Sequence, residues 1–214
     1  MIIAFIGGTG EEGMGLAHRF AAAGHACIIG SRSEERAQAA VAELREKDAS
    51  HKLSGATNAD AVTQAELAVL TTPFSAQADT LPPLAAACAG KIVVSTVVPM
   101  SFAGGTARLM AVPEGSAAEQ AQALLPEARV VAAFQNLSAR KLLKGGPVDA
   151  DVVVCAEDAA DRRAIMDLAA GIEGVRGVDG GVLANSLMVE AITVLLVSIN
   201  RAYKTQAGIK IAGV

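Results

Sequence analysis

A chain of 214 residues is long enough for one full α/β domain with a small appendage, and its 52% hydrophobic content supplies a sizeable core. The net charge of −4 and the 3% aromatic content argue against nucleic-acid binding, which needs a basic patch and stacking platforms. The three cysteines, Cys27, Cys88 and Cys155, lie in apolar stretches without C-x-x-C spacing. We therefore expect buried free thiols and a cytoplasmic location.

No secretory or membrane segment is expected. Met1 leads directly into a strand that the fold needs, so we predict no signal peptide. The most apolar segment, residues 191–199, is bounded by Glu190 and Asn200. It is shorter than the roughly eighteen apolar residues that a bilayer span requires.

The N-terminal stretch has the pattern of a β-α-β unit. The apolar run at residues 1–6 indicates a buried parallel strand, and residues 16–24 have the spacing of a helix that stops at Gly24. A second apolar strand is expected at residues 26–29. The loop that joins the first strand to the helix fits G-x-G-x-x-G at Gly8, Gly10 and Gly13.

Each of these glycines has an expected role in binding a dinucleotide. Gly8 permits the tight turn out of the strand, Gly10 lets the backbone approach a pyrophosphate, and Gly13 lets the helix pack close to the sheet. The pyrophosphate would meet free N–H groups at the start of the helix. The alternative is a glycine-rich turn in another α/β protein, which the flanking strand and helix disfavour.

The end of the second strand predicts which dinucleotide binds. An NAD site usually places Asp or Glu there to hold the ribose 2′-hydroxyl, whereas this chain has Ser31 and Arg32, with Arg36 one helical turn further on. A guanidinium matches the geometry of a phosphate, and the serine can donate its hydroxyl. The pattern therefore favours NADP over NAD, the alternative being a solvated, charged start to the next helix.

The rest of the chain continues the alternation of strands and helices. We predict an α/β fold in which residues 1–146 form a Rossmann-type, doubly wound, mostly parallel sheet, and residues 147–214 form a small C-terminal α/β extension. Glycines and a proline between residues 104 and 115 indicate a loop. Further strands are expected at residues 52–57, 67–70, 91–100, 130–134, 151–155 and 175–178, and helices at residues 33–47, 58–65, 116–125, 158–170 and 183–203. The expected N-caps of the first three of these helices are Ser33, Asn58 and Ser116.

Two strand tips are candidates for contact with the nicotinamide half of the cofactor, because ligands of open α/β sheets bind at the carboxyl ends of strands. One tip is Thr72-Pro73-Phe74 and the other is Val98-Pro99-Met100. Both are apolar and neither carries a titratable group. Pro73 also fits the first position of the following helix, and the two interpretations are compatible.

The last predicted helix, residues 183–203, is apolar on nearly every side. Such a helix is normally buried, against its own domain, against a second subunit, or both. One small domain offers too little surface to cover all of it, so we expect a two-fold homodimer.

Six short motifs of the chain occur together at residues 7–10, 30–32, 94–99, 115–119, 183–186 and 208–210. Together they resemble the NADPH-dependent reductases of coenzyme F420. The resemblance covers the whole chain and implies hydride exchange between the nicotinamide and a deazaflavin, which depends on ring stacking and needs no metal and no catalytic side chain. Some members carry a histidine where this chain has Gln135, which can donate a hydrogen bond but cannot carry a proton.

The resemblance also implies roles for individual residues. Thr9, Gly10, Glu11 and Glu12 would form the phosphate loop, and Ser31, Arg32 and Arg36 would hold the 2′-phosphate. The nicotinamide would be walled by Pro73, Phe74, Val98, Pro99, Met100 and Ala139. The deazaflavin would lie near Gln135, Leu137, Ala207 and Gly208.

Three alternatives remain open at this point. Residues 134–139 fit a reductase with a flavin or ferric acceptor about as well. An imine or small-acid reductase usually needs a larger helical C-terminal domain than this chain can supply. A non-catalytic NADPH sensor would keep the glycine loop and the arginines while losing the second pocket, and fold analogy alone does not decide among these.

Overall fold

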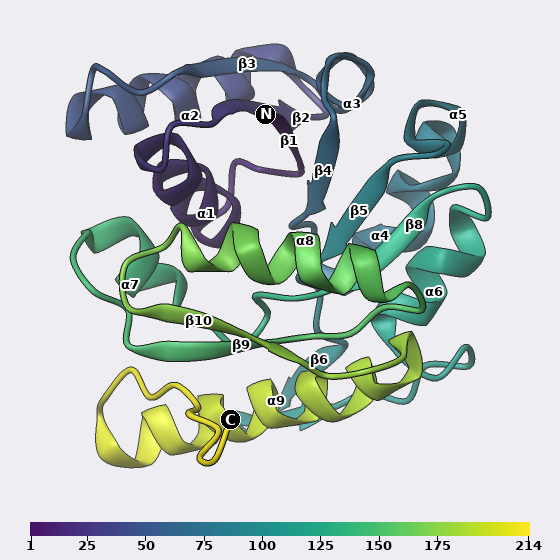
Figure 1. Ribbon diagram of the computed structural model, residues 1–214, viewed down its shortest axis with the longest axis vertical. Helices are drawn as coiled ribbons and strands as arrows, with labels where there is room; N and C mark the ends of the chain where they lie inside the picture. The colour runs from purple at the N-terminus through teal and green to yellow at the C-terminus, as the bar shows by residue number, and fades with distance from the viewer.

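The computed structural model describes residues 1–214 and contains a central six-stranded sheet in which every pairing is parallel. The strand order is β3-β2-β1-β4-β5-β8 (Figure 1). Strands β1 to β3 are added toward one edge and β4, β5 and β8 toward the other, so the order of addition reverses between β1 and β4. This is the Rossmann-type, doubly wound topology expected from the alternating pattern. The strands are β1 (Ile2–Ile6), β2 (Ala26–Ser31), β3 (Leu53–Thr57), β4 (Leu67–Leu70), β5 (Ile92–Ser95) and β8 (Arg129–Ala132).

Helices cover both faces of this sheet, and each face has its own hydrophobic core. Phe5, Phe20 and Leu44 belong to one core, and Ala4, Leu70 and Leu125 belong to the other. The first face carries α1 (Glu11–Ala22), α2 (Glu34–Lys47), α7 (Ala139–Lys144) and α8 (Ala159–Ala170). The second carries α3 (Asn58–Gln64), the 3₁₀ turn η1 (Pro82–Leu84), α5 (Ala85–Cys88) and α6 (Ala117–Leu124), with α4 (Phe74–Thr80) leading into η1.

Side-chain caps begin several of these helices. Ser33 accepts a hydrogen bond from the Arg36 N–H, and Ser116 accepts one from the Glu119 N–H, as the sequence predicts. The cap of α3 is Thr57, whereas the sequence suggested Asn58. Because Thr57 caps the helix, the Asn58 side chain is free to make another contact, which is described below.

The C-terminal third adds a second, two-stranded parallel sheet made of β9 (Ala150–Val154) and β10 (Val175–Asp179). An isolated antiparallel bridge joins Ala132 at the end of β8 to Cys155 just after β9. Val152 and Ile165 belong to the same core as Phe5, so both parts of the chain contribute to one hydrophobic core. The predicted boundary at residue 146, between a nucleotide-binding domain and a C-terminal extension, stays a prediction.

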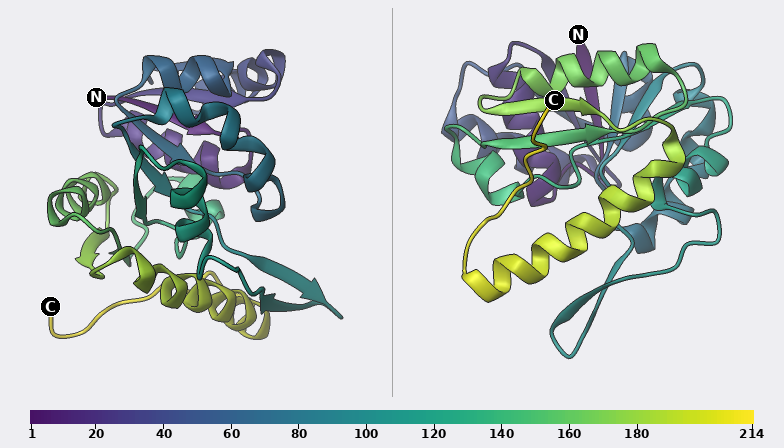
Figure 2. Two further views of the ribbon diagram at one scale, coloured as in Figure 1. Left: turned by 90° about the vertical axis from the view of Figure 1, so that its right-hand side faces the viewer. Right: turned by 60° about the horizontal axis from the view of Figure 1, so that its bottom comes forward.

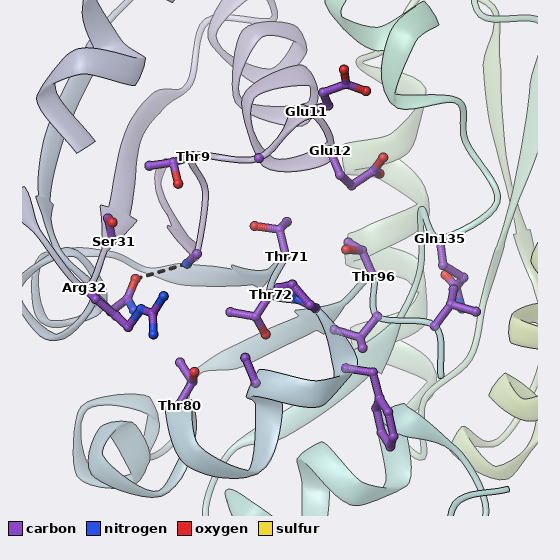
Figure 3. A pocket seen from close by; sticks show the side chains of 18 of the residues that line it. Thr9, Glu11, Glu12, Ser31, Arg32, Thr71, Thr72, Thr80, Thr96 and Gln135 are labelled. Atoms are coloured by element: carbon purple, nitrogen blue, oxygen red, sulfur yellow. Dashed lines mark hydrogen bonds between the residues drawn. The ribbon is translucent and has the colours of Figure 1, made fainter. Parts of the chain in front are cut away.

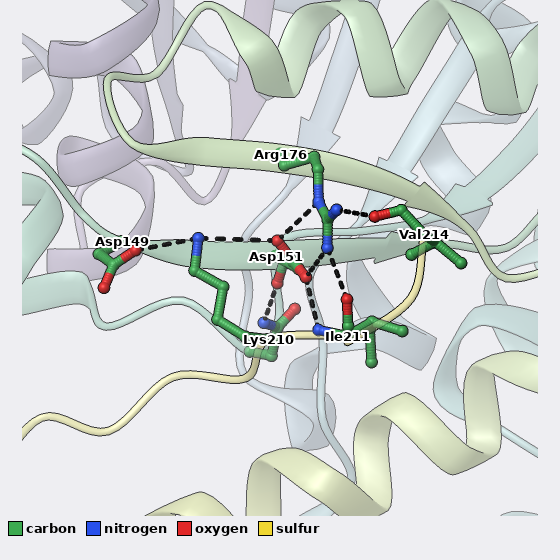
Figure 4. Close-up of polar contacts among 7 residues, drawn as sticks. Asp149, Asp151, Arg176, Lys210, Ile211 and Val214 are labelled. Atoms are coloured by element: carbon green, nitrogen blue, oxygen red, sulfur yellow. Dashed lines mark hydrogen bonds and ion pairs between the residues drawn. The ribbon is translucent and has the colours of Figure 1, made fainter.

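The C-terminal tail lies against β9 and is fastened by Asp151, whose side chain is fully buried (Figure 4). Asp151 accepts hydrogen bonds from Arg176 Nη2 at 2.6 Å and from the Ile211 N–H at 2.6 Å. Arg176 also donates to the carbonyls of Ile211 and Val214. The hydrogen bonds from Arg176 lower the pKa of the Asp151 carboxyl, so it is ionised at neutral pH.

An antiparallel hairpin, β6 (Met100–Ala103) and β7 (Thr106–Leu109), replaces two of the predicted features. The strand expected over residues 91–100 ends at Ser95, and the loop expected at Gly104 and Gly105 is the turn of this hairpin. Both glycines have positive φ, 58° and 75°, as a two-residue hairpin turn requires. The hairpin projects from the body of the molecule beside α9 (Figure 2).

The last helix, α9 (Ser186–Tyr203), follows a 3₁₀ turn, η2 (Leu183–Asn185). Only one side of α9 is buried in this chain, through residues that include Val189, Glu190 and Val194. Its other side exposes Met188 and Leu195. The whole segment Leu183–Tyr203 is long and apolar enough to cross a membrane by length and composition, although a core helix of a soluble protein passes the same test.

Candidate active site

A cavity of about 580 Å³ opens at the carboxyl ends of the central strands (Figure 3). It lies at the reversal of strand order between β1 and β4, where open α/β sheets bind ligands. The lining residues are Gly7, Thr9, Gly10, Glu11, Glu12, Ser31, Arg32, Arg36, Asn58, Thr71, Thr72, Pro73, Phe74, Ala76, Thr80, Thr96, Val97, Val98, Met100 and Gln135.

The glycine loop turns sharply between β1 and α1. The turn itself depends on Gly7, whose φ is +70°, and not on Gly8 as the motif suggested. Gly8 is required for space, because a Cβ there would lie 2.6 Å from the Phe5 Cβ. Gly13 has the expected packing role, since its Cβ would lie 2.6 Å from the Gly8 Cα. A Cβ on Gly10 would meet only open space, which leaves the backbone accessible to a ligand.

The start of α1 is suited to bind an anion. Gly10 is its N-cap and supplies no side-chain cap. The first turn of a helix leaves N–H groups without partners inside the helix, and the helix dipole adds positive potential there. A pyrophosphate placed against residues 10–12 would satisfy these groups.

The tip of β2 carries cations and no acid. Ser31 is buried at the end of the strand, and its hydroxyl accepts a hydrogen bond from the Ser33 N–H at 3.4 Å. Arg32 and Arg36 are exposed, line the cavity and form no ion pair. Two free guanidinium groups at this tip fit a 2′-phosphate, and no carboxylate is present to hold a bare 2′-hydroxyl.

The tips of β4 and β5 form the inner wall of the cavity. Thr71 donates its hydroxyl to the Ile6 carbonyl at 3.1 Å, and Thr96 donates its hydroxyl to the Leu70 carbonyl at 3.0 Å. These bonds fix the two tips relative to β1 and β4. The Thr72 hydroxyl is buried in the same wall without a partner and is free to bond a ligand.

Gln135 closes the far side of the cavity. The residue is 5% exposed, and neither Oε1 nor Nε2 of its side chain has a hydrogen-bond partner. The preceding residue, Phe134, is fully buried and adopts a φ of 70°, which is unfavourable for a bulky residue. A buried amide without partners is costly, so both of its polar atoms are available to bond a ligand that offers a donor and an acceptor.

Glu12 is half-buried in the cavity wall, and one of its carboxyl oxygens is a further buried polar atom without a partner. Its Oε1 has no hydrogen bond, and burial raises the pKa of the carboxyl to about 8. The group is therefore neutral at pH 7 and able to donate a proton to a hydrogen bond. A neutral side chain here adds no negative charge next to the phosphate loop.

The structure brings most of the expected site residues together, and six lie elsewhere. Gly13 lies beneath the loop, and Pro99 sits between Val98 and Met100 without lining the cavity. Leu137 is buried in the core, and Ala139 begins α7 beside Gly15. Ala207 and Gly208 belong to the C-terminal tail, where Ala207 donates to Asn200 and Gly208 lies against Ala150.

Several lining residues escaped the sequence analysis. The most informative is Asn58, whose Oδ1 accepts a hydrogen bond from the Gly7 N–H at 3.0 Å and so supports the glycine loop from α3. Asn58, Thr71 and Thr96 each follow a strand directly, at the edge where ligands bind. Polar residues at that position were the signal that could have found them. The others are Gly7, Ala76, Thr80 and Val97.

A parallel sheet whose first crossover carries this loop, and whose second strand ends in cations, defines a Rossmann-type oxidoreductase built for NADP. The chain is 45% identical to an F420-dependent NADP reductase of Methanothermobacter marburgensis, over 99% of this chain and 98% of the relative. It is 40% identical to the enzyme of the same name from Methanocaldococcus jannaschii, over 99% and 98%. The chain belongs to the family of F420-dependent NADP reductases.

Two further comparisons agree. Residues 2–99 match the family described as NADP oxidoreductase, coenzyme F420-dependent. A crystal structure of a candidate F420-dependent NADP reductase from Arthrobacter sp. FB24 superposes with a TM-score of 0.84 at 28% identity, covering 98% of each chain. The similarity therefore includes the C-terminal third as well as the nucleotide-binding part.

Proposed function

We propose that this protein transfers a hydride between NADP(H) and the deazaflavin coenzyme F420. The buried Gln135 amide, which lines the NADP cavity without a partner, supports an acceptor ring with a polar edge, and membership of the F420-dependent family favours F420 over a flavin. A deazaflavin presents adjacent N–H and C=O groups on its pyrimidine ring, and a side-chain amide matches such an edge with one acceptor and one donor.

The residues of the chain have binding and positioning roles in this reaction. The start of α1 and the arginines Arg32 and Arg36 hold the phosphates of NADP. Pro73 and Val98 form apolar wall beside the reacting rings and limit water there. Bound together, the two coenzymes supply the redox chemistry, a hydride passing from one ring to the other.

No side chain needs to move a proton in this scheme. The catalytic contribution of the protein is to hold two flat rings in contact, which stacking and phosphate anchoring accomplish. Gln135 orients the acceptor and does not titrate.

A flavin is the second candidate acceptor, because it presents the same pyrimidine edge to Gln135. The deciding experiment mixes the protein with NADPH and either F420 or FMN and follows the absorbance of both partners. Reduction of F420 at a far higher kcat/KM than FMN is the expected result. No turnover with F420 in the presence of bound NADPH would reject the proposal.

Gln135 provides a sharper test with a matched control. Gln135→Leu keeps the approximate size of the side chain and removes both polar atoms. The KM for F420 should therefore rise by about tenfold or more, while the KM for NADPH stays unchanged. Gln122→Leu is unsuitable as a control because Gln122 is hydrogen-bonded in the fold. Gln38→Leu is the better comparison, because the Gln38 side chain is exposed and makes a single hydrogen bond, to the Gly55 carbonyl.

We further propose that the protein is a two-fold homodimer. The hairpin and α9 lie together and expose a set of large apolar side chains that includes Phe102 (64% exposed), Met188 and Leu195. A second copy offers the same surface, as a two-fold interface requires. Light scattering should give twice the chain mass, and Leu195→Glu should give a monomer; a monomer mass for the unaltered protein would reject the proposal.

The buried state of all three thiols also supports a reducing compartment, and we propose the cytoplasm.

A further inference from the structure

A second cavity, separate from the one that holds NADP in the proposal, lies between α7 and the C-terminal end of α9. It has a volume of about 700 Å³, and no large hydrophobic side chain lines it. We call it the basic cavity. Its lining residues are Arg140, Lys141, Lys144, Gly145, Pro147, Asn200, Lys204, Thr205 and Gln206.

The basic cavity collects four cations and no carboxylate. Arg140, Lys141 and Lys144 come from α7, and Lys204 ends α9. None of the four forms an ion pair. The whole chain has a net charge of −4, so a concentration of unpaired cations in one concave site runs against the overall composition. Such a site attracts anions, because like charges lining one concave surface reinforce one another's potential.

A buried arginine fixes the α7 wall of the cavity. Arg19 of α1 donates from Nε to the Leu142 carbonyl and from Nη2 to the Lys141 carbonyl, each at 2.7 Å. It therefore satisfies carbonyl groups at the end of α7 and holds this short helix against α1. The cations of α7 are thereby presented from a supported backbone.

The basic cavity begins close to Gln135. Ser138 donates its hydroxyl to Oε1 of Gln206, a lining residue, at 3.1 Å. Ser138 is three residues from Gln135, and a chain spans at most about 3.6 Å per residue, so the two residues are no more than about 11 Å apart. A flexible, extended group attached to a ring at Gln135 can reach this cavity.

The phosphates of NADP have their own partners at α1 and at Arg32, so they leave the basic cavity without a ligand. We propose that the basic cavity binds the anionic tail of the second substrate, recognising a phosphodiester followed by carboxylates. F420 carries such a tail of glutamyl residues on a phosphodiester, so this inference rests on the proposed function and extends it. Lysine and arginine side chains are the usual partners of both groups.

The test compares F420 with the same deazaflavin ring lacking the phosphodiester and glutamates. In the unaltered protein, KM for F420 should be well below KM for the tail-less compound. The double variant Lys141→Gln/Lys144→Gln should raise KM for F420 about tenfold and leave KM for the tail-less compound and for NADPH unchanged. Lys204→Gln, on the opposite wall, should give a smaller change of the same kind.

The matched control is Lys47→Gln/Lys52→Gln, which removes the same charge from exposed positions far from α7 in the sequence and should leave all three KM values unchanged. Equal KM values for F420 and the tail-less compound in the unaltered protein would overturn the inference while leaving the proposed function intact. Turnover with neither compound would instead overturn the proposed function.

A second experiment distinguishes binding of the F420 tail in the basic cavity from binding of a free anion there. Inorganic phosphate and triglutamate are added in turn at constant ionic strength. Inhibition by triglutamate that is competitive with F420, and absent with the tail-less compound, supports the inference. Binding of phosphate to the basic cavity, measured by titration, with no effect of either anion on KM for F420, would assign the cavity to a free anion and overturn it.

Discussion

The glycine loop and the wall that carries Gln135 line the same cavity, but they are held in place by different means. The loop is fixed mainly by the backbone of its own β-α-β unit, with the Gly8 N–H donating to the carbonyls of Phe5 and Gly30, and by one side chain from outside the unit, Asn58. The Gln135 wall is fixed from distant parts of the chain. Thr193 of α9 donates its hydroxyl to the Gln135 carbonyl at 3.1 Å, and Asn136 donates to the Asp151 carbonyl at 2.7 Å.

Because of this difference, the two halves of the site respond differently to substitutions. A backbone-built phosphate site depends on few side chains and tolerates substitution around it. The acceptor side depends on α9, β9 and the tail staying docked, so residues that never touch a ligand decide its geometry. Two buried carboxylates, Glu190 and Asp151, carry much of this docking.

The largest expected effect concerns Glu190, which docks α9 against the start of α6. Its carboxylate accepts hydrogen bonds from the N–H groups of Ala117 and Ala118 at 3.1 and 3.2 Å. Burial is the main cause that raises its pKa from 4.5 to about 7, and the negative charge of Glu119 adds to it. The native state therefore keeps the proton that the unfolded chain loses near pH 4.5, so this group's stabilisation is complete below pH 4.5 and is lost as the pH rises to about 7.

Glu190→Gln removes this titration. Between pH 5 and pH 8 the unfolding free energy of the variant should rise relative to the unaltered protein by on the order of 3 kcal/mol. Urea unfolding at several pH values measures the difference. Glu46→Gln, exposed on α2, is the control and should show no such trend. A difference that does not change with pH would show that Glu190 is not buried as described.

The next largest effect concerns Asp151, which fastens the C-terminal tail. Asp151→Ala should lower the unfolding free energy by about 2 kcal/mol, below the value for a fully buried pair because Arg176 is partly exposed and screened by solvent. Urea unfolding measures it, and protease digestion should release the C-terminal tail first. Asp79→Ala is the control, since Asp79 is exposed on α4 and forms no ion pair. An equal loss of unfolding free energy in both variants would show that Asp151 does not fasten the tail.

A smaller effect is expected at the 2′-phosphate site. Arg32→Ala should weaken NADPH binding by about 1.5 kcal/mol, roughly tenfold, through loss of a charge-assisted contact at an exposed position. NADH binding should stay nearly unchanged. Fluorescence titration of both nucleotides measures the two constants. If both weaken equally, Arg32 does not contact the 2′-phosphate.

The smallest effect concerns Glu12. Its pKa of about 8 means that the carboxyl is neutral at pH 7 and becomes negative above pH 8, beside the pyrophosphate site. NADPH affinity should therefore fall by about 1 kcal/mol as the pH rises from 7 to 9. Glu12→Gln should flatten this dependence in the same titration. A pH dependence that survives in the variant would assign it to another group.

The sequence predicted well those features that depend on neighbours in the chain. The strands of the central sheet and the caps Ser33 and Ser116 were found because their signals lie within a few residues. The sequence does not predict the hairpin, although Gly104-Gly105 between two short runs is a turn signal, because the apolar run up to Met100 has the pattern of one longer strand. α7 was missed because six residues give too little periodicity.

The acceptor side could not be predicted for a different reason. The contact of Glu190 with Ala117 spans 73 residues, and no local pattern encodes such a pair. The left-handed Phe134, which precedes Gln135, likewise breaks the preference of its residue type. Positions 207 and 208 are expected near the acceptor by resemblance alone. The structure puts them on the tail beside β9, next to Gln206, and their contact with the acceptor stays a prediction.

The bridge between Ala132 and Cys155 has a consequence for how copies of the protein can associate. The two residues exchange both backbone hydrogen bonds, at 2.8 and 3.0 Å, so the end of β8 offers no free donors or acceptors on its outer side. An unprotected outermost strand invites pairing with another chain and growth into an aggregate. At this end of β8 that route is closed, so a second copy cannot extend the central sheet there.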